Sequence, residues 1–155
     1  MNTSESQQTV PNSRRNRLAR ASRTGAVLVE FALILPILFT IVLAAIDFGR
    51  FAHSHIAVTN SARVGAGYAC MHPYTTGTQS LWEAKIREAA KNEMQGVVNY
   101  DDILLTMTSP QVTTDSDGQK RVRVEVKYPF QTLITWPFVP SSFLMTRAVE
   151  MRFIR

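Results

Sequence analysis

The longest uninterrupted run of apolar residues lies near the start of the chain. It covers residues 26–46 and contains a single charged side chain, Glu30. A helix of this length rises about 30 Å, which matches the hydrocarbon thickness of a lipid bilayer. The run therefore predicts a transmembrane helix, and Pro36 should kink it by removing one backbone donor.

Helical spacing of apolar residues continues after this run. The positions that keep the spacing are Phe48, Phe51, Ile56, Val58, Ala62 and Ala66. We therefore expect a single long helix over residues 26–68, which begins in the bilayer and emerges from it. Gly65 and Gly67 should weaken its far end, because glycine is a poor helix former.

A second helix is expected over residues 80–97. Ser80 and Glu83 have the spacing of a capping box, in which each side chain binds the backbone of the other residue. One face of this helix is apolar, which predicts that this face packs on the core. Its residues are Trp82, Ile86, Ala89 or Ala90, and Val97.

After Asn99 the period of the apolar positions changes to two, which is typical of β-strands. Ile103, Leu105 and Met107 alternate with Asp102 and Thr106, and the next alternation covers residues 121–128. A turn at residues 115–118 separates these strands, and Pro129 should end the second of them.

A third alternation closes the chain at residues 148–153. The fold class is therefore α+β: a long transmembrane helix continues into a small domain, in which a second helix packs on a three-stranded or larger antiparallel sheet. We divide the chain into a disordered basic leader (1–25), the long helix (26–68) and an extracytoplasmic domain (69–155).

The net charge of +5 is placed unevenly along the chain. The leader, residues 1–25, carries five arginines and one glutamate, which leaves a net charge of only +1 for residues 26–155. Positive charge just before a membrane span predicts that the N-terminus is cytoplasmic and that the C-terminal domain crosses the membrane. This placement, without a basic face elsewhere, argues against a nucleic-acid partner.

Gly25 and Glu30 lie where the basic leader meets the apolar run. A charge in the middle of an apolar span costs roughly 2.5–3.5 kcal/mol, so Glu30 is a candidate functional residue. Cleavage after Gly25 would make Ala26 the N-terminus, and an α-amine with a pKa of about 7.7–8.0 is largely cationic. In a filament of staggered helices this amine and the Glu30 carboxylate of a neighbour would neutralise each other. Alternatively, Gly25 is an ordinary leader residue and Glu30 reaches the lipid head groups.

Three separate blocks of the sequence carry a family resemblance. They are residues 23–36 (RTGAVLVEFALILP), residues 47–50 (DFGR) and residues 59–66 (TNSARVGA). In order and spacing they resemble TadE-like proteins over residues 23–68. The resemblance implies a minor pilin or pseudopilin of a tight-adherence (Flp, type IV-like) pilus in the bacterial inner membrane.

This resemblance also implies partners and site residues. It implies a prepilin peptidase that cleaves between Gly25 and Ala26, an assembly role for Glu30 with Phe31, and contacts with other pilin-like subunits and the assembly platform. Major Flp pilins are typically short and have Glu-Tyr where this chain has Glu30-Phe31. Together with the sizeable C-terminal domain, this difference favours a minor component.

Asp47, Gly49 and Arg50 are expected at the membrane boundary. In that interpretation Asp47 and Arg50 lie in water while Phe48 and Phe51 anchor the helix at the interface. The alternative is a specific contact with another subunit.

Chemistry beyond assembly finds little support in the sequence. His53 and His55 are two residues apart and point to different faces of a helix, so with Cys70 and His72 they do not form a zinc pattern. Cys70 is expected to be a small buried residue, although a link between two subunits stays open. We predict no enzymatic activity, no metal and no cofactor.

Two alternatives to the pilin interpretation remain. One is an uncleaved, single-pass, membrane-anchored domain that binds a periplasmic partner, for which Glu30 would be dispensable. The other is a secreted protein cleaved near residues 42–44, although the apolar run is longer than that of an ordinary signal peptide.

Overall fold

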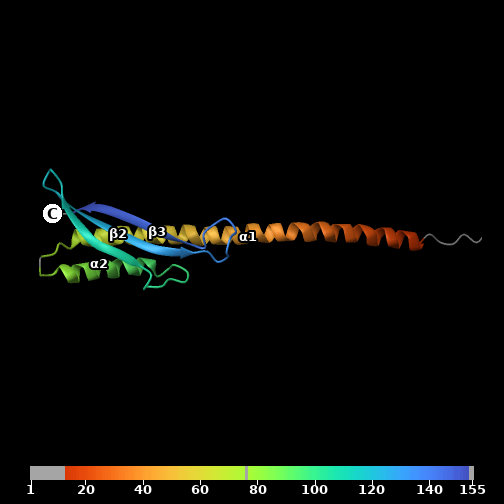
Figure 1. Ribbon diagram of the computed structural model, residues 1–155, viewed down its shortest axis with the longest axis horizontal. Helices are drawn as coiled ribbons and strands as arrows, with labels where there is room; N and C mark the ends of the chain where they lie inside the picture. The colour runs from red at the N-terminus through yellow and green to blue at the C-terminus, as the bar shows by residue number, and fades with distance from the viewer. Residues whose placement is uncertain (1–12, 76, 154–155) are drawn as a thin grey trace, which may run out of the picture. The chain divides into compact units, whose positions relative to one another are not determined.

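The computed structural model describes the backbone of residues 13–75 and 77–153 and the side chains of residues 25–75 and 77–153. Within these residues the chain forms two helices and a three-stranded antiparallel sheet (Figure 1). The bounds are α1 Ser13–Met71, α2 Gln79–Met94, β1 Thr106–Thr114, β2 Lys120–Gln131 and β3 Ser142–Arg152. This arrangement confirms the predicted α+β fold.

The chain divides into two units, Met1–Ala44 and Ala45–Arg155. We call the described part of the second unit, residues 45–75 and 77–153, the head. The head contains the C-terminal part of α1, all of α2 and the whole sheet.

Helix α1 begins earlier than the sequence predicted. Residues 13–25, expected to be disordered, are helical from Ser13 onward, while residues 1–12 lie outside the described part. The prediction rested on the polar composition of this segment, which is poor in large apolar groups. Arginine, alanine and leucine are nevertheless strong helix formers, so the segment can extend a helix that the apolar run nucleates.

Helix α2 is shorter than predicted, and the predicted capping box does not form at its N-terminus. It begins at Gln79, its N-cap residue is Thr78, and no side chain caps its first amide groups. The Thr78 hydroxyl instead bonds within the preceding turn, where it donates to the Thr75 carbonyl at 3.2 Å. The predicted buried face is correct for Trp82, Ile86 and Ala90, and Met94 completes it.

Strand β1 begins later than predicted because residues 102–104 form a turn. The Asp101 carboxylate accepts a hydrogen bond from the Ile103 amide at 2.9 Å, a local bond that competes with strand formation. Ile103 is exposed in this turn, so only Leu105 and Met107 of the predicted alternation are buried. The predicted turn at 115–118 is confirmed, with Gly118 at a φ of 77°.

Strand β2 runs through Pro129, which was expected to end it. Pro129 faces Leu144 of β3, whereas the pairing of β1 with β2 reaches no further than Lys127. The strand therefore has a neighbour on one side only at this point, and a proline without an N–H is tolerated there.

The core of the head lies where α1, α2 and the sheet meet. Small buried residues of α1, including Ala62 and Ala66, allow this close approach. A Cβ built on Gly65 would lie 3.4 Å from side-chain atoms of both Ile86 on α2 and Val124 on β2. Gly65 is thus a packing position, which its low helix propensity did not indicate.

Candidate functional site

The apolar segment of α1 is uncovered by any other described part of the chain. Among the described residues one helix is long and apolar enough to cross a membrane, and no residue of its most apolar stretch is buried. Leu33 and Phe39 are examples, with more than half of each side chain exposed. Burying such side chains fully is worth about 1.5–3 kcal/mol each, so the segment requires an apolar environment from outside the chain.

The residues predicted for processing and assembly all lie on this segment. Gly25, Ala26, Glu30 and Phe31 are exposed, helical positions of α1. Gly25 and Glu30 face different directions, because their separation along a helix corresponds to a rise of about 7.5 Å and a rotation of about 140°. The Glu30 carboxylate has no ion-pair partner among the residues whose side chains the structure describes.

Asp47 is the best-connected carboxylate of the head. It is only 6% exposed, and its Oδ1 accepts a hydrogen bond from the Leu133 amide at 2.9 Å. Its Oδ2 accepts one from the Trp136 indole at 3.0 Å. The expectation that Asp47 lies in water is therefore wrong, because the loop between β2 and β3 folds over it.

These contacts change the acidity of Asp47. Burial alone would raise its pKa, since a buried carboxylate is poorly solvated. Hydrogen bonds from the Leu133 backbone, the Trp136 indole and the Ile134 backbone, together with the charge of Arg50, outweigh burial and lower the pKa below its usual value. The group is thus held as a carboxylate that ties the loop to the helix.

Arg50 connects this carboxylate to a group of aromatic rings. Its Nη1 lies 3.2 Å from the Asp47 Oδ1, and its guanidinium carbon lies 5.7 Å from the centre of the Phe130 ring. Phe51 packs edge-on against Phe130 at 5.6 Å between ring centres, and Phe143 lies within 5.4 Å of Phe51. Arg50 is therefore half-buried by partners within the head and is not a freely solvated charge.

Of the other predicted boundary residues, Gly49 and Phe48 are exposed. A Cβ at Gly49 would meet no atom within 4 Å, and Phe48 is 71% exposed. Phe48 thus stays available for the interfacial role predicted for it, whereas Phe51 is used in the aromatic packing of the head.

Leu133 and Trp136 were not predicted as partners of Asp47. They lie 86 and 89 residues further along the chain, so no local pattern relates them to it. One signal was present: Asp47 follows an apolar run directly, and such a charge is expected to find a partner when it is not solvated.

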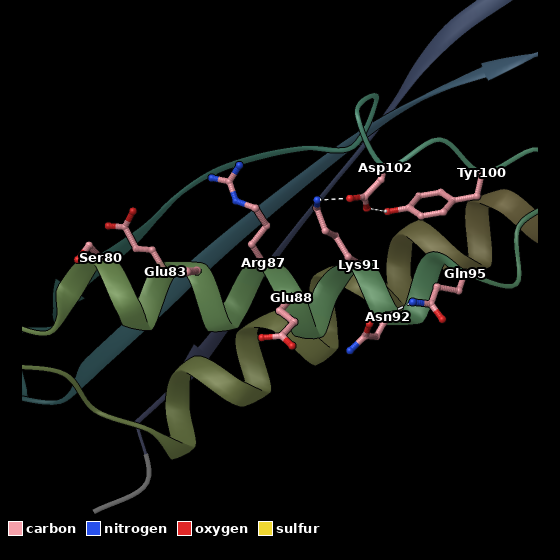
Figure 2. Close-up of a pocket in the computed structure, with 10 residues that line it drawn as sticks. Ser80, Glu83, Arg87, Glu88, Lys91, Asn92, Gln95, Tyr100 and Asp102 are labelled. Atoms are coloured by element: carbon pink, nitrogen blue, oxygen red, sulfur yellow. Dashed lines mark hydrogen bonds and ion pairs between the residues drawn. The ribbon is translucent and has the colours of Figure 1, made fainter.

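A second candidate surface is an open hollow of about 790 Å³ along the outer face of α2. Figure 2 shows Lys91 pointing from α2 to Asp102, whose other oxygen accepts a hydrogen bond from the Tyr100 hydroxyl at 2.9 Å. The Lys91 and Tyr100 bonds together lower the pKa of Asp102, and burial and the Asp102 carboxylate raise the pKa of Tyr100. The lining mixes both signs of charge, and three of its polar side chains, Lys91, Asp102 and Tyr100, bond to one another.

The histidines and the cysteine predicted not to form a metal site are dispersed. In the described part of the chain no three metal-ligating side chains come together. Cys70 is a free, buried thiol, and its burial raises its pKa. His55 instead lies against Arg147 of β3.

Comparison with known proteins gives one match. Residues 25–67 match the family described as TadE-like protein. This confirms the resemblance found in the sequence, and the matched segment lies entirely within α1, beginning at Gly25 and including Glu30, Asp47 and Arg50. No curated protein matches the chain, and no solved structure does.

Proposed function

We propose, from the TadE-like match of residues 25–67, that this chain is a minor pilin-like subunit of a tight-adherence, type IV-like pilus. The observation that carries the proposal is the coincidence of two features in one segment. The match begins at Gly25, and from there α1 presents an apolar surface that the rest of the described chain leaves uncovered. Such a surface can be satisfied first by lipid and then by the helices of other subunits.

In this proposal residues 26–46 cross the inner membrane, with the N-terminus in the cytoplasm and the head outside. The work of the protein is structural and involves no catalysis. A prepilin peptidase removes residues 1–25, and the new amine at Ala26 pairs with Glu30 of a neighbouring subunit. The exposure of Glu30 leaves its carboxylate accessible to a neighbouring subunit, which supports an intermolecular partner.

Processing is tested by the intact mass of the protein extracted from membranes of its native host. Removal of residues 1–25 would leave a chain that begins at Ala26 and ends at Arg155. The mass of that shorter chain is the expected result. A chain of full length would contradict processing and would favour the uncleaved, membrane-anchored domain.

The role of Glu30 is tested by Glu30→Ala in the same host, with Val29→Ala as the matched control on the neighbouring position. We expect both variants to enter the membrane, because removing a charge from an apolar span favours insertion. Only Glu30→Ala should fail to enter sheared filaments. Equal recovery of both variants in the filament fraction would contradict the assembly role.

A further inference from the structure

The loop that joins β2 to β3 has an unusual composition for an exposed segment. Residues 132–141 read TLITWPFVPS and contain no charged side chain. Phe138 is 96% exposed and Leu133 is 61% exposed, and Val139 beside Phe138 is exposed as well. Contiguous apolar groups on a surface indicate an interaction site, because water solvates them poorly.

The loop is held in place, so this exposure is not the result of loose packing. At its base the Thr132 amide donates to the Ser141 carbonyl at 2.9 Å. In its middle the Leu133 amide and the Trp136 indole both donate to Asp47. The prolines at 137 and 140 further restrict the backbone. The apolar side chains are therefore presented in a fixed arrangement.

Asp47 places this loop relative to the apolar run. Asp47 directly follows Ile46, the last residue of the run. The polar layer on each side of a bilayer is about 5–7 Å thick, whereas a helix rises only about 1.5 Å per residue. If residues 26–46 fill the hydrocarbon layer, Asp47 lies in the polar layer, and the loop bonded to it lies at the same depth.

The connections at the two ends of β2 differ in charge, as expected if only the 132–141 loop lies at the membrane. The loop at 132–141 follows the end of β2, and the turn at 115–118, with sequence DSDG, precedes its start. The length of β2 separates these ends by about 40 Å. Figure 1 shows the loop at the end of the sheet away from the C-terminus. The loop at one end of β2 carries no charge, whereas the turn at the other end carries Asp115 and Asp117.

We propose that residues 132–141 form a membrane-contact loop, which inserts Leu133, Phe138 and Val139 into the interfacial layer of the bilayer that α1 crosses. The partner is the lipid surface, and Trp136 has the side chain that this layer favours. Asp47 and the loop bonded to it then lie together in the polar layer. The inference rests on the membrane span of the proposed function.

The test uses the full chain in lipid vesicles, with an environment-sensitive dye on one cysteine at a time in a Cys70→Ala background. The sites are Phe138→Cys in the loop, Phe39→Cys in the span and Met71→Cys as the matched control. Met71 is also a large apolar residue, 65% exposed, and lies on α1 about 36 Å beyond Asp47 at about 1.5 Å per residue. The readout is quenching of the dye by brominated phosphatidylcholine.

We expect strong quenching at position 39, and several-fold more quenching at position 138 than at position 71. Adding Asp47→Asn should reduce quenching at 138 and leave position 39 unchanged. Quenching at 39 without quenching at 138 would overturn this inference alone, and so would equal quenching at 138 and 71. A blue shift of the dye emission at position 138 without quenching by brominated lipid would overturn the lipid contact. It would instead indicate that the loop binds a second copy of the chain. No quenching at 39 would overturn the membrane span itself.

Discussion

Residues 27–46 and residues 58–70 belong to the same helix but differ in the size and burial of their apolar side chains. The first segment carries mainly leucine, isoleucine, valine and phenylalanine, and none of its most apolar stretch is buried by the described chain. The second is rich in alanine, glycine and serine, and its buried residues, which include Val58 and Cys70, belong to the core that α1 shares with α2 and the sheet.

This difference shows that apolar character alone does not decide which part of a helix is buried. Alanine, glycine and serine let backbones approach closely, and the Ser61 hydroxyl donates to the Ala90 carbonyl of α2 at 2.8 Å. Large side chains instead give the first segment a surface that suits lipid or other helices. The two halves of α1 are thus specialised for two environments, one outside the chain and one within it.

The largest expected effect is on the free energy of unfolding, when an isoleucine that is buried in the head is compared with one that is exposed on the apolar segment. Ile86→Ala should lower the free energy of unfolding of the head by about 2–5 kcal/mol, because Ile86 is fully buried and its removal leaves a cavity. Ile34→Ala should change it by less than about 0.5 kcal/mol. Urea unfolding of the detergent-solubilised chain, followed by tryptophan fluorescence, measures both values. Equal losses would show that the two halves of α1 are not independent in stability.

Next in size is the effect of side-chain volume at Gly65. Gly65→Leu should cost about 1–3 kcal/mol of stability, since its side chain meets Ile86 and Val124. Gly67→Leu is the matched control, because a Cβ there meets nothing within 4 Å and the gain in helix propensity is the same. Gly65→Ala should be neutral or stabilising. The midpoint of thermal unfolding of each variant measures these effects. If Gly65→Leu unfolds at the same temperature as Gly67→Leu, the packing role of Gly65 is contradicted.

Asp47→Asn should destabilise the head by about 1–3 kcal/mol at neutral pH, because an amide cannot accept from both Leu133 and Trp136 in the same way. Its lowered pKa gives the sign of the pH dependence. The contribution of the carboxylate is fully present above its unfolded pKa of about 3.9 and is lost as the pH falls through the lower folded value.

The difference in the free energy of unfolding between the native chain and Asp47→Asn should therefore become smaller as the pH falls. Urea unfolding of both proteins between pH 7 and pH 2 measures this difference. Glu88→Gln is the control, since Glu88 and its partner Lys85 form an exposed surface pair, a kind of pair that contributes little to stability. If this difference in the free energy of unfolding stays constant down to pH 2, Asp47 does not act as a stabilising carboxylate.

The smallest effect is expected at Cys70, whose thiol lies at the end of the buried half of α1. Cys70→Ala removes one atom from the core and should cost less than about 1.5 kcal/mol. In the native protein the thiol should react with a soluble disulfide reagent far more slowly than after unfolding in urea, because burial hides it and raises its pKa. Rapid reaction of the folded protein would instead favour a link between subunits.

Local patterns determined much of this protein. The apolar run, the alternation of residues 122–128 and the turn ending in Gly118 follow from periodicity and backbone preference, which act over a few residues. They predicted the α+β fold and the membrane-length helix. Gly25 and Glu30 were also identified locally, from a charge placed at an apolar boundary. Their roles in processing and assembly stay predictions.

Only the tertiary structure decided the rest. It changed Asp47 from a solvated boundary charge into the carboxylate that holds residues 132–141, and Gly65 from a weak helix position into the contact of α1 with α2 and β2. It also let Pro129 continue β2 along β3. In each case the deciding partner is far away in the sequence. Burial and hydrogen bonding depend on neighbours in space, and periodicity along the chain carries no record of those neighbours.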